Sequence, residues 1–172
     1  MKKLLILLLA FVMVASLAAC GGDSQGATEP NATNAPTAQG EGFVFTYKGT
    51  KIAIHAEAAP ILAALGEPKS YTEQASCAFE GLDKTYYYGS FYLDTYPNGD
   101  KDYVYGFWFA DDSVSTEEGI YIGATKAEVE KAYGADAFNG SNAYNITKGD
   151  NILTILLEND VVTSIQYSLA LN

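Results

Sequence analysis

Few side chains in this sequence are of the types that carry out catalysis. His55 is the only histidine, and no serine or cysteine motif accompanies it, which argues against a histidine-dependent nucleophile or a zinc site. The chain contains no Gly-x-Ser-x-Gly elbow, no phosphate-binding Gly-x-x-x-x-Gly-Lys loop and no His-Glu-x-x-His motif. One group of oxygen-bearing residues has an order that fails the EF-hand spacing and is typical of a hairpin turn: Asp94, Asn98, Asp100 and Asp102. We therefore expect neither an enzyme nor a cofactor or metal site.

The cysteine that carries the clearest chemical signal lies near the N-terminus. Met1-Lys2-Lys3 precedes an apolar run from Leu4 to Ala19, a pattern typical of a secretory signal peptide. The end of this run, Leu17-Ala18-Ala19-Cys20, resembles the lipobox of bacterial lipoproteins. That resemblance implies cleavage before Cys20 and acylation of this residue, and two or more acyl chains form a stable membrane anchor. The alternative is an ordinary cleaved signal followed by an incidental cysteine.

Composition divides the chain into three parts. Residues 1–19 form the expected lipoprotein signal peptide. Residues 20–42 contain the lipidated Cys20 and then mainly small and polar residues without an aromatic, so we expect a flexible tether. Residues 43–172 form the expected folded domain. If Cys20 is acylated, Cys77 has no partner for an internal disulfide, and we expect it to be a small buried residue rather than a nucleophile.

The charge of the chain limits its possible partners. The 172 residues contain 10 basic residues, all of them lysine, and 21 acidic residues, which gives a net charge of -11. An acidic chain without arginine is a poor nucleic-acid binder, because phosphate contacts need clustered cations. We expect partners at the extracytoplasmic face of the cell membrane: lipid through the acylated Cys20, and an envelope or extracellular protein.

The folded part contains an internal similarity. Residues 52–66 align without a gap on residues 120–134, and each segment reads as a short strand followed by a helix that ends at glycine, Gly66 or Gly134. Thr125 and Glu128 form a capping-box signature, and Pro60 lies in the first turn of its helix, where proline is tolerated. A β-meander follows each helix. The expected strands are 76–80, 85–95 and 103–109 in the first half, and 143–147, 151–158 and 161–169 in the second.

These observations predict an α+β fold made of two strand–helix–β-meander repeats, about 43–112 and 113–172. The simplest arrangement is one antiparallel sheet with both helices on one face.

Two stretches of the sequence resemble known families. Residues 122–134, Ile-Gly-Ala-Thr-Lys-Ala-Glu-Val-Glu-Lys-Ala-Tyr-Gly, are similar to an element of the SmpA/OmlA and β-lactamase-inhibitor-protein-like superfamily. Residues 76–88 with 118–120 are similar to lipoproteins of Gram-positive gut bacteria. The first resemblance implies protein binding through an aromatic-rich sheet face. The chain departs from it, since His55 and Glu57 occupy the positions of Gly123 and Thr125, and the paired disulfides of the secreted inhibitor are missing.

The repeat also assigns strand faces. Phe107 aligns with Ile165 and Phe109 with Tyr167, while Phe91 and Leu93 align with Ile155 and Leu157, which places all eight on the core side. The expected binding residues then lie on the opposite, open face: Tyr86, Tyr88, Tyr92 and Trp108, bordered by Ser90 and Asp94. Two alternatives remain open. The segment 43–47 covers this face, or the tyrosines only stabilise the strands as cross-strand pairs.

The sequence therefore predicts a lipid-anchored module that binds a protein or peptide. The first alternative is a receptor for a glycan or another small molecule that uses the same aromatic residues. The second alternative is a structural lipoprotein of envelope assembly.

Overall fold

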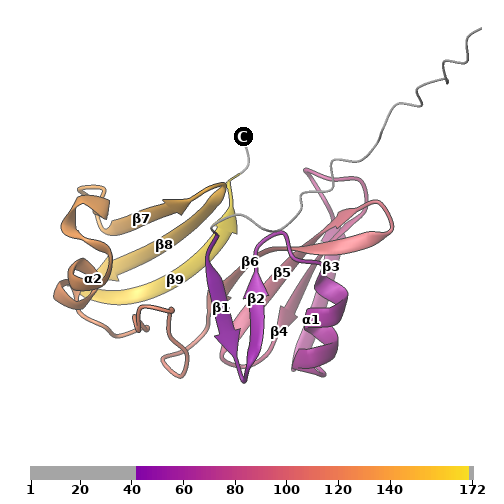
Figure 1. Ribbon diagram of the computed structural model, residues 1–172, viewed down its shortest axis with the longest axis horizontal. Helices are drawn as coiled ribbons and strands as arrows, with labels where there is room; N and C mark the ends of the chain where they lie inside the picture. Colours follow the sequence, from indigo (N-terminus) through magenta and orange to yellow (C-terminus); the bar gives the residue numbers. More distant parts are fainter. Residues whose placement is uncertain (1–41, 171–172) are drawn as a thin grey trace, which may run out of the picture. The chain divides into compact units, whose positions relative to one another are not determined.

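The computed structural model describes residues 42–170 (Figure 1). The described elements are β1 (Val44–Tyr47), β2 (Thr50–Ala53), α1 (Ala58–Leu65), β3 (Ser70–Ala75), β4 (Leu82–Tyr87), β5 (Phe91–Asn98), β6 (Lys101–Phe109), α2 (Lys126–Tyr133), the 3-10 turn η1 (Ala135–Ala137), β7 (Ala143–Lys148), β8 (Asn151–Glu158) and β9 (Val161–Leu169). Cys20, the expected signal peptide and all but the last residue of the expected tether lie outside the described residues.

The main sheet is antiparallel and has seven strands in the order β3-β4-β5-β6-β9-β8-β7. With the two helices it confirms the expected α+β class. The expectation of one sheet is wrong, because β1 and β2 form a separate two-stranded hairpin.

Both helices begin and end where the sequence predicts. Thr125 caps α2, its side chain accepts from the Glu128 backbone N–H, and the Glu128 carboxylate accepts from the Thr125 N–H. Gly66 and Gly134 follow the last helical residues with φ of 77° and 86°, a backbone region that favours glycine.

The second meander matches its predicted bounds to within one residue, whereas the first differs. Ser76–Glu80 is a loop between β3 and β4, and the single strand expected over Thr85–Thr95 is two strands joined by a turn at Gly89-Ser90. Ile120–Ile122 is not a strand but leads into a turn. The leading strand of the second half is therefore absent from the described structure, although β2 is present in the first half.

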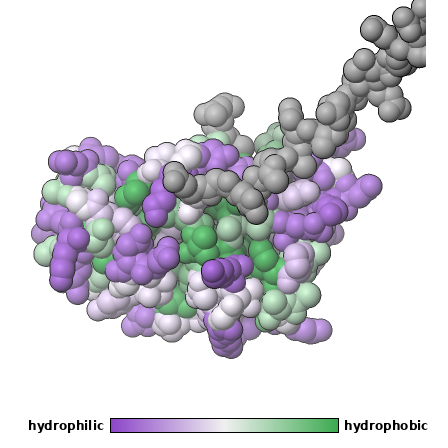
Figure 2. All heavy atoms as spheres, in the orientation of Figure 1, coloured by the Kyte–Doolittle hydropathy of each residue, from purple (hydrophilic) through white to green (hydrophobic). Residues whose placement is uncertain are grey.

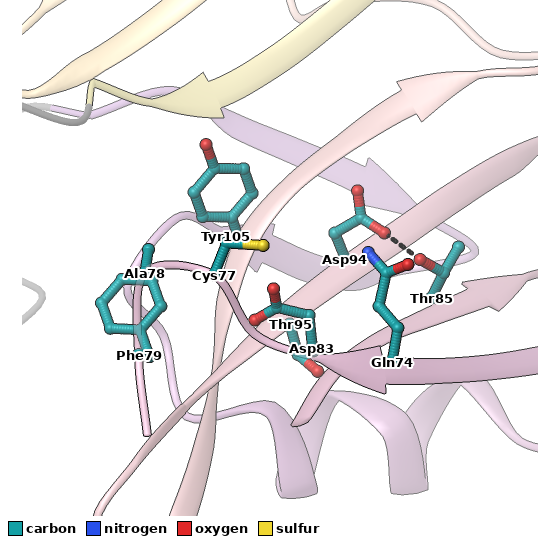
Figure 3. A pocket seen from close by; sticks show the side chains of 9 residues that line it. All are labelled: Gln74, Cys77, Ala78, Phe79, Asp83, Thr85, Asp94, Thr95 and Tyr105. Carbon is teal, nitrogen blue, oxygen red and sulfur yellow. Dashed lines mark hydrogen bonds between the residues drawn. The ribbon is translucent and has the colours of Figure 1, made fainter. Parts of the chain in front are cut away.

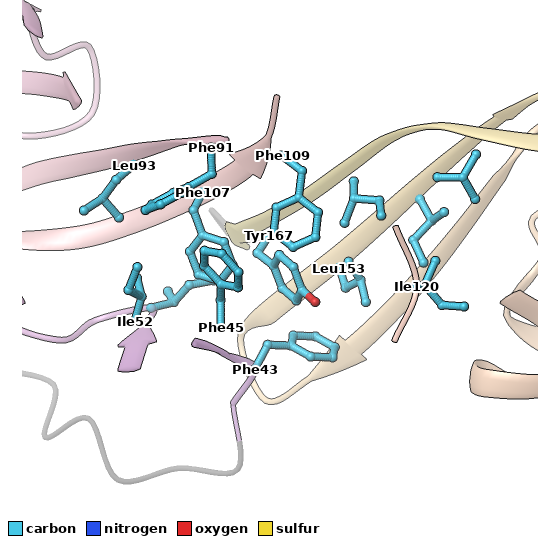
Figure 4. Packing of buried hydrophobic residues seen from close by; sticks show 14 of the residues in the cluster. Phe43, Phe45, Ile52, Phe91, Leu93, Phe107, Phe109, Ile120, Leu153 and Tyr167 are labelled. Atoms are coloured by element: carbon cyan, nitrogen blue, oxygen red, sulfur yellow. The ribbon is translucent and has the colours of Figure 1, made fainter. Parts of the chain in front are cut away.

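One face of the sheet carries the apolar core (Figure 4). All eight residues that the sequence assigns to the core side are buried there. Ile61 of α1 and Val129 of α2 belong to the same cluster, so both helices contribute to this side. Phe45 of β1 contacts Phe91, Phe107 and Phe109, with ring centroids 5.0–5.4 Å apart. The segment 43–47 therefore covers the core and not the opposite face. In the space-filling view, apolar residues show in the middle and hydrophilic residues around them (Figure 2).

The segment before each helix is hydrogen-bonded to the last strand of the meander that follows it. The His55 N–H donates to the Val104 carbonyl, and the Val104 N–H donates to the Ala56 carbonyl, both at 2.9 Å. Gly123, Ala124 and Val162 make the same pair of bonds on β9, both at 2.8 Å. The β5–β6 pairing and the β8–β9 pairing also share an irregularity. Tyr105 of β6 has no directly opposed residue on β5, and Thr163 of β9 has none on β8.

Strands β6 and β9 join the two meanders along a short stretch. Gly106, Phe107 and Trp108 pair with Ser168, Tyr167 and Gln166. Glycine is required at position 106, because a β-carbon there would collide with the backbone carbonyl of Tyr167. The open face of the sheet therefore continues across this junction.

Candidate functional site

A row of directly paired residues crosses all seven strands on the face opposite the core. In strand order, its members are Ser70, Tyr87, Tyr92, Trp108, Gln166, Thr154 and Asn145. Directly opposed residues of antiparallel strands lie on the same face, so these side chains share one line. The three aromatic members on β4, β5 and β6, named here the aromatic row, are partly exposed.

The rings of the aromatic row stack on one another. The centroids of Tyr87 and Tyr92 lie 4.4 Å apart with an interplanar angle of 24°, and those of Tyr92 and Trp108 lie 4.7 Å apart at 11°. The Nζ of Lys69 lies 5.9 Å from the Tyr87 centroid. The two distances between ring centroids match the distance between neighbouring strands, about 4.8 Å.

The stacking determines which parts of the rings a partner can reach. Rings lying flat on the sheet could not bring their centroids this close, so the rings face their neighbours. Both faces of Tyr92 are covered, one by Tyr87 and one by Trp108. The surface therefore offers a ridge of ring edges with polar tips, rather than a flat ring face at its centre.

Of the four residues predicted for this face, the structure brings Tyr92 and Trp108 together and not the other two. Tyr88 is only 9% exposed, lies in the core and stacks on Phe91 with centroids 5.3 Å apart. Tyr86 pairs with the buried Leu93 and packs against the core. The predicted placement of Tyr86 and Tyr88 on the open face is wrong.

The turn at Gly89-Ser90 is the cause of this error. A continuous strand would place Tyr86, Tyr88 and Tyr92 on one face, but a hairpin between them reverses the chain, so that Tyr87 pairs with Tyr92. Gly89 has a φ of 96°, and the Tyr88 N–H donates to the Phe91 carbonyl. Gly-Ser between two strand-forming runs is a two-residue hairpin signal, and it would have identified Tyr87 as the missing member.

A pocket of about 280 Å³ adjoins the aromatic row on the same face (Figure 3). It lies between the sheet and the loop 76–81, which joins β3 to β4. Its lining residues are Gln74, Cys77, Ala78, Phe79, Asp83, Thr85, Asp94, Thr95 and Tyr105. Cys77 is exposed and lines this pocket, so the expectation that it is buried is wrong.

Asp94 is the most perturbed ionisable group of the pocket. Burial raises the pKa of its carboxyl group from 3.8 to about 6, although the hydrogen bond from Thr85 acts in the opposite direction and the charge of Asp83 adds to the rise. The Thr85 hydroxyl donates to Oδ1 of Asp94 at 2.5 Å. At neutral pH the pocket therefore holds an ionised, partly desolvated carboxylate with no basic residue among its lining residues.

A chain of contacts holds the loop over the pocket. Phe79 packs on the buried Tyr96, with ring centroids 4.4 Å apart. The Tyr96 hydroxyl lies 3.0 Å from Nδ1 of His55, and Nε2 of His55 lies 2.8 Å from Oδ2 of Asp150. His55 has a φ of 67°, which is uncommon for a residue other than glycine. The only histidine is thus placed as a structural link between the loop, β5 and the turn before β8.

Residues 42–170 contain no group of three or more His, Cys, Asp or Glu side chains placed to hold a metal ion. Within the same range, no helix is long and apolar enough to cross a membrane.

The chain was compared with known proteins on three levels. No protein-family model matches it, and neither a curated protein nor a solved structure gives a significant match.

Proposed function

We propose that the chain is a lipid-anchored binding module of the cell envelope, which recognises an extracytoplasmic protein segment through the aromatic row. Acylated Cys20 would provide the anchor, and the domain would carry the recognition surface. The observation that carries this proposal is the stack of Tyr87, Tyr92 and Trp108, which are partly exposed on the sheet face opposite the core. Tyrosine and tryptophan dominate the energetic centres of protein interfaces because they are large, rigid and amphipathic.

The orientation of the rings favours a peptide over a sugar. A sugar ring stacks against an open aromatic face, but both faces of Tyr92 are occupied by its neighbours. Ring edges and hydroxyl groups suit the side chains and backbone of an extended segment, which can follow a ridge across several strands. The outer face of Trp108, which lies toward Gln166, is the position that a glycan would use.

The charge of the chain favours a basic partner. A net charge of -11 produces a negative potential that attracts cationic surfaces and disfavours acidic ones. Complementary charge mainly raises the rate of association and excludes wrong partners. The partner segment is therefore expected to combine apolar with basic residues.

We also propose that the domain arose by duplication. The equivalent hydrogen bonds relate His55 to Gly123 and Val104 to Val162. The shared ladder irregularity relates Tyr105 to Thr163, with the same offset along the strand as Val104 and Val162. Strand order supports the same relation, because β4-β5-β6 meets β9-β8-β7 in mirrored sequence at the junction.

This relation divides the row across the sheet into two equivalent halves. Trp108 corresponds to Gln166, Tyr92 to Thr154 and Tyr87 to Asn145. The same pairing relates Phe91 and Leu93 to Leu153 and Ile155, so the sequence alignment of these two residues with Ile155 and Leu157 is shifted by two positions. Aromatic residues occupy one half, and amide and hydroxyl residues occupy the other. Under the duplication, β3 is an additional strand of the first half, and the two halves have diverged so that one carries the recognition surface.

Selection of peptides tests the binding proposal. The full chain in detergent is used to enrich sequences from a random peptide display library, and the affinity of the enriched peptides is measured by calorimetry. We expect Tyr92→Ala and Trp108→Ala each to weaken binding by about tenfold or more. Tyr121→Ala, which removes an exposed tyrosine from a turn, is the matched control and should leave affinity unchanged.

The same preparations are applied to a glycan array. Peptides that bind the Trp108→Ala variant as well as they bind the parent chain would refute recognition through the aromatic row. A glycan whose binding depends on Trp108, in the absence of any enriched peptide, would support the receptor alternative.

A further inference from the structure

We propose that the pocket beneath loop 76–81 binds a protonated primary amine, the lysine side chain of the segment that docks on the aromatic row. This inference rests on the proposed function for the source of the amine. The pocket's preference for a primary ammonium group can be tested independently with a small probe.

The polar groups of the pocket are suited to an ammonium ion. Asp94 on β5 and Asp83 on β4 supply carboxylates, and Gln74 on β3 supplies an amide oxygen. The nearest lysine on the same strand as Asp83, Lys84, already bonds Asp102 at 2.6 Å. An ionised carboxylate in a desolvated position gains most from a cation that also donates hydrogen bonds.

The walls of the pocket add to this preference. Phe79 and Tyr105 line the cavity, and their rings attract a cation through the negative potential of their faces. The thiol of Cys77 and the carboxyl group of Asp94 are turned toward the same space (Figure 3). The volume of about 280 Å³ lies just below the range of small-molecule sites, about 300–1,000 Å³, so it suits one long side chain.

Thr95 is a buried polar residue of the pocket lining. Thr95 lies at the irregularity of β5 and is among the residues that line the pocket. It is 1% exposed, and its hydroxyl oxygen has no hydrogen-bond partner among the described residues. Thr95 pairs with the core residue Val104, on the face opposite Asp94, so its hydroxyl lies behind the pocket rather than among the groups that would meet an amine.

The pocket and the aromatic row have the spacing of an extended chain. Asp94 follows Tyr92 by two residues on the same face of β5, a separation of about 7 Å. Alternate side chains of an extended peptide are the same distance apart. A segment running along β5 can therefore place an apolar side chain on the aromatic row and a lysine in the pocket.

The other half of the sheet lacks these features. The position that corresponds to Asp94 beside the β8–β9 irregularity is Leu156, which pairs with Ser164 and is 37% exposed. The carboxylate is thus confined to the half that carries the aromatic row, as expected if both act on one partner.

The first experiment uses n-butylammonium, which represents the end of a lysine side chain, with n-butanol and butyrate as neutral and anionic controls. Binding to the full chain in detergent is followed at pH 7.5 through NMR shifts of Gln74, Thr85 and Asp94. We expect saturable shifts with n-butylammonium alone and at least a tenfold loss of affinity in Asp94→Asn. Asp136→Asn removes an exposed carboxylate outside the pocket and should bind as the parent chain does.

The second readout is the reactivity of Cys77 in a Cys20→Ser variant, where it is the only thiol. n-Butylammonium should slow the alkylation of Cys77 by iodoacetamide, and n-butanol should not. Equal binding of n-butylammonium to the parent chain and to Asp94→Asn, or equal binding of n-butanol, would overturn the amine site.

A peptide arm separates the two proposals. An enriched peptide is compared with its lysine-to-norleucine variant on the parent chain and on Asp94→Asn. If the norleucine peptide binds the parent chain with about tenfold lower affinity than the lysine peptide, and the two peptides bind Asp94→Asn equally, a lysine in the pocket is supported. If the aromatic row binds peptides with no dependence on lysine or Asp94, the inference fails while the proposed function stands. If n-butylammonium binds but no peptide does, the pocket is a site for free amines and the proposed function fails.

Discussion

Trp108 of β6 and Gln166 of β9 face each other directly across the junction of the two meanders. The indole is stacked on Tyr92 on one side and borders an amide on the other, so the aromatic part of the open face ends at this pair. The duplication proposal gives the pair a further meaning, because the two residues occupy the same position in the two repeats. On that proposal, one position of an ancestral unit would hold a ring in one copy and an amide in the other.

Trp108 is the only tryptophan of the chain, so its fluorescence reports on the aromatic row alone. Because its side chain is partly exposed, we expect quenching by acrylamide in the free chain and protection when an enriched peptide binds. The emission maximum should shift to shorter wavelength at the same time, since the peptide removes water from the indole. An emission spectrum and quenching constant that stay the same at saturating peptide would contradict docking on this face.

A second prediction concerns the two adjacent tyrosines at the end of β4. Tyr88 is buried against Phe91, so Tyr88→Ala should lower the free energy of unfolding by about 3–4 kcal/mol. Tyr87 is on the open face, and Tyr87→Ala should lower it by about 1 kcal/mol or less. Urea denaturation followed by circular dichroism measures both. Similar losses from the two variants would show that the assignment of faces around Gly89-Ser90 is incorrect.

The sequence predicts regular elements well where a local signal marks both ends. The capping box at Thr125 and the glycines that end both helices defined the ends of α1 and α2. The assignment of strand faces from the alternation of residues failed for Tyr86 and Tyr88. The hairpin signal of Gly89-Ser90 lies inside an otherwise strand-like run, and the chain reverses there.

Other features depend on contacts between distant segments. Ile120–Ile122 has the alternation of a strand, but the next residues turn and Gly123 bonds Val162 instead. The pocket needs loop 76–81 to fold back, which Phe79 achieves by packing on Tyr96, a residue 17 positions later in the chain. Cys77 is exposed for the same reason. Local patterns do not contain this information.

A third prediction follows from the raised pKa of Asp94. The folded chain holds this proton more tightly than the unfolded chain, so between about pH 3.8 and 6 the ionisation of Asp94 lowers the stability as pH rises. Asp94→Asn should therefore raise the free energy of unfolding at pH 7.5 by about 1–2 kcal/mol. This difference in the free energy of unfolding between the variant and the parent chain should shrink as pH falls through 6 and vanish near pH 4.

Urea titrations of the parent chain and the variant at both pH values measure this difference. The neighbouring groups that face Asp94 in the pocket, Asp83, Cys77 and Tyr105, are unchanged in the comparison. A variant that is less stable than the parent chain at pH 7.5 would show that the ionised carboxylate contributes favourably to folding.

A fourth prediction tests the link through His55. His55→Ala leaves the buried hydroxyl of Tyr96 without its partner, which should lower the free energy of unfolding by about 2 kcal/mol. Asp150 is largely exposed, so Asp150→Ala should change it by about 1 kcal/mol or less. Thermal and urea denaturation provide the values. If Asp150→Ala is as damaging as His55→Ala, the contact of His55 with Asp150, and not its contact with Tyr96, is the important one.

A fifth prediction concerns the junction. Gly106→Ala introduces a methyl group against the Tyr167 carbonyl, and neither backbone can yield without separating β6 from β9. We expect a loss of about 3 kcal/mol in unfolding free energy. Gly119→Ala is a control at a glycine with open space around it, where only the positive φ of 85° opposes the substitution, and its loss should be smaller. Hydrogen exchange of the β6 and β9 amides locates the change.

The short joint between β6 and β9 has an evolutionary consequence. If the two repeats once existed as separate chains, the same strand pairing would have held a symmetric homodimer together, with a row of identical side chains on each side of its axis. On that proposal, fusion would have released each copy from having to mirror the other, so that rings and a carboxylate could accumulate on one side only. Such a surface can distinguish the two directions of a bound polypeptide, which a symmetric one cannot. Cutting the link between the copies and asking whether the fragments reassemble would connect that history to the present fold.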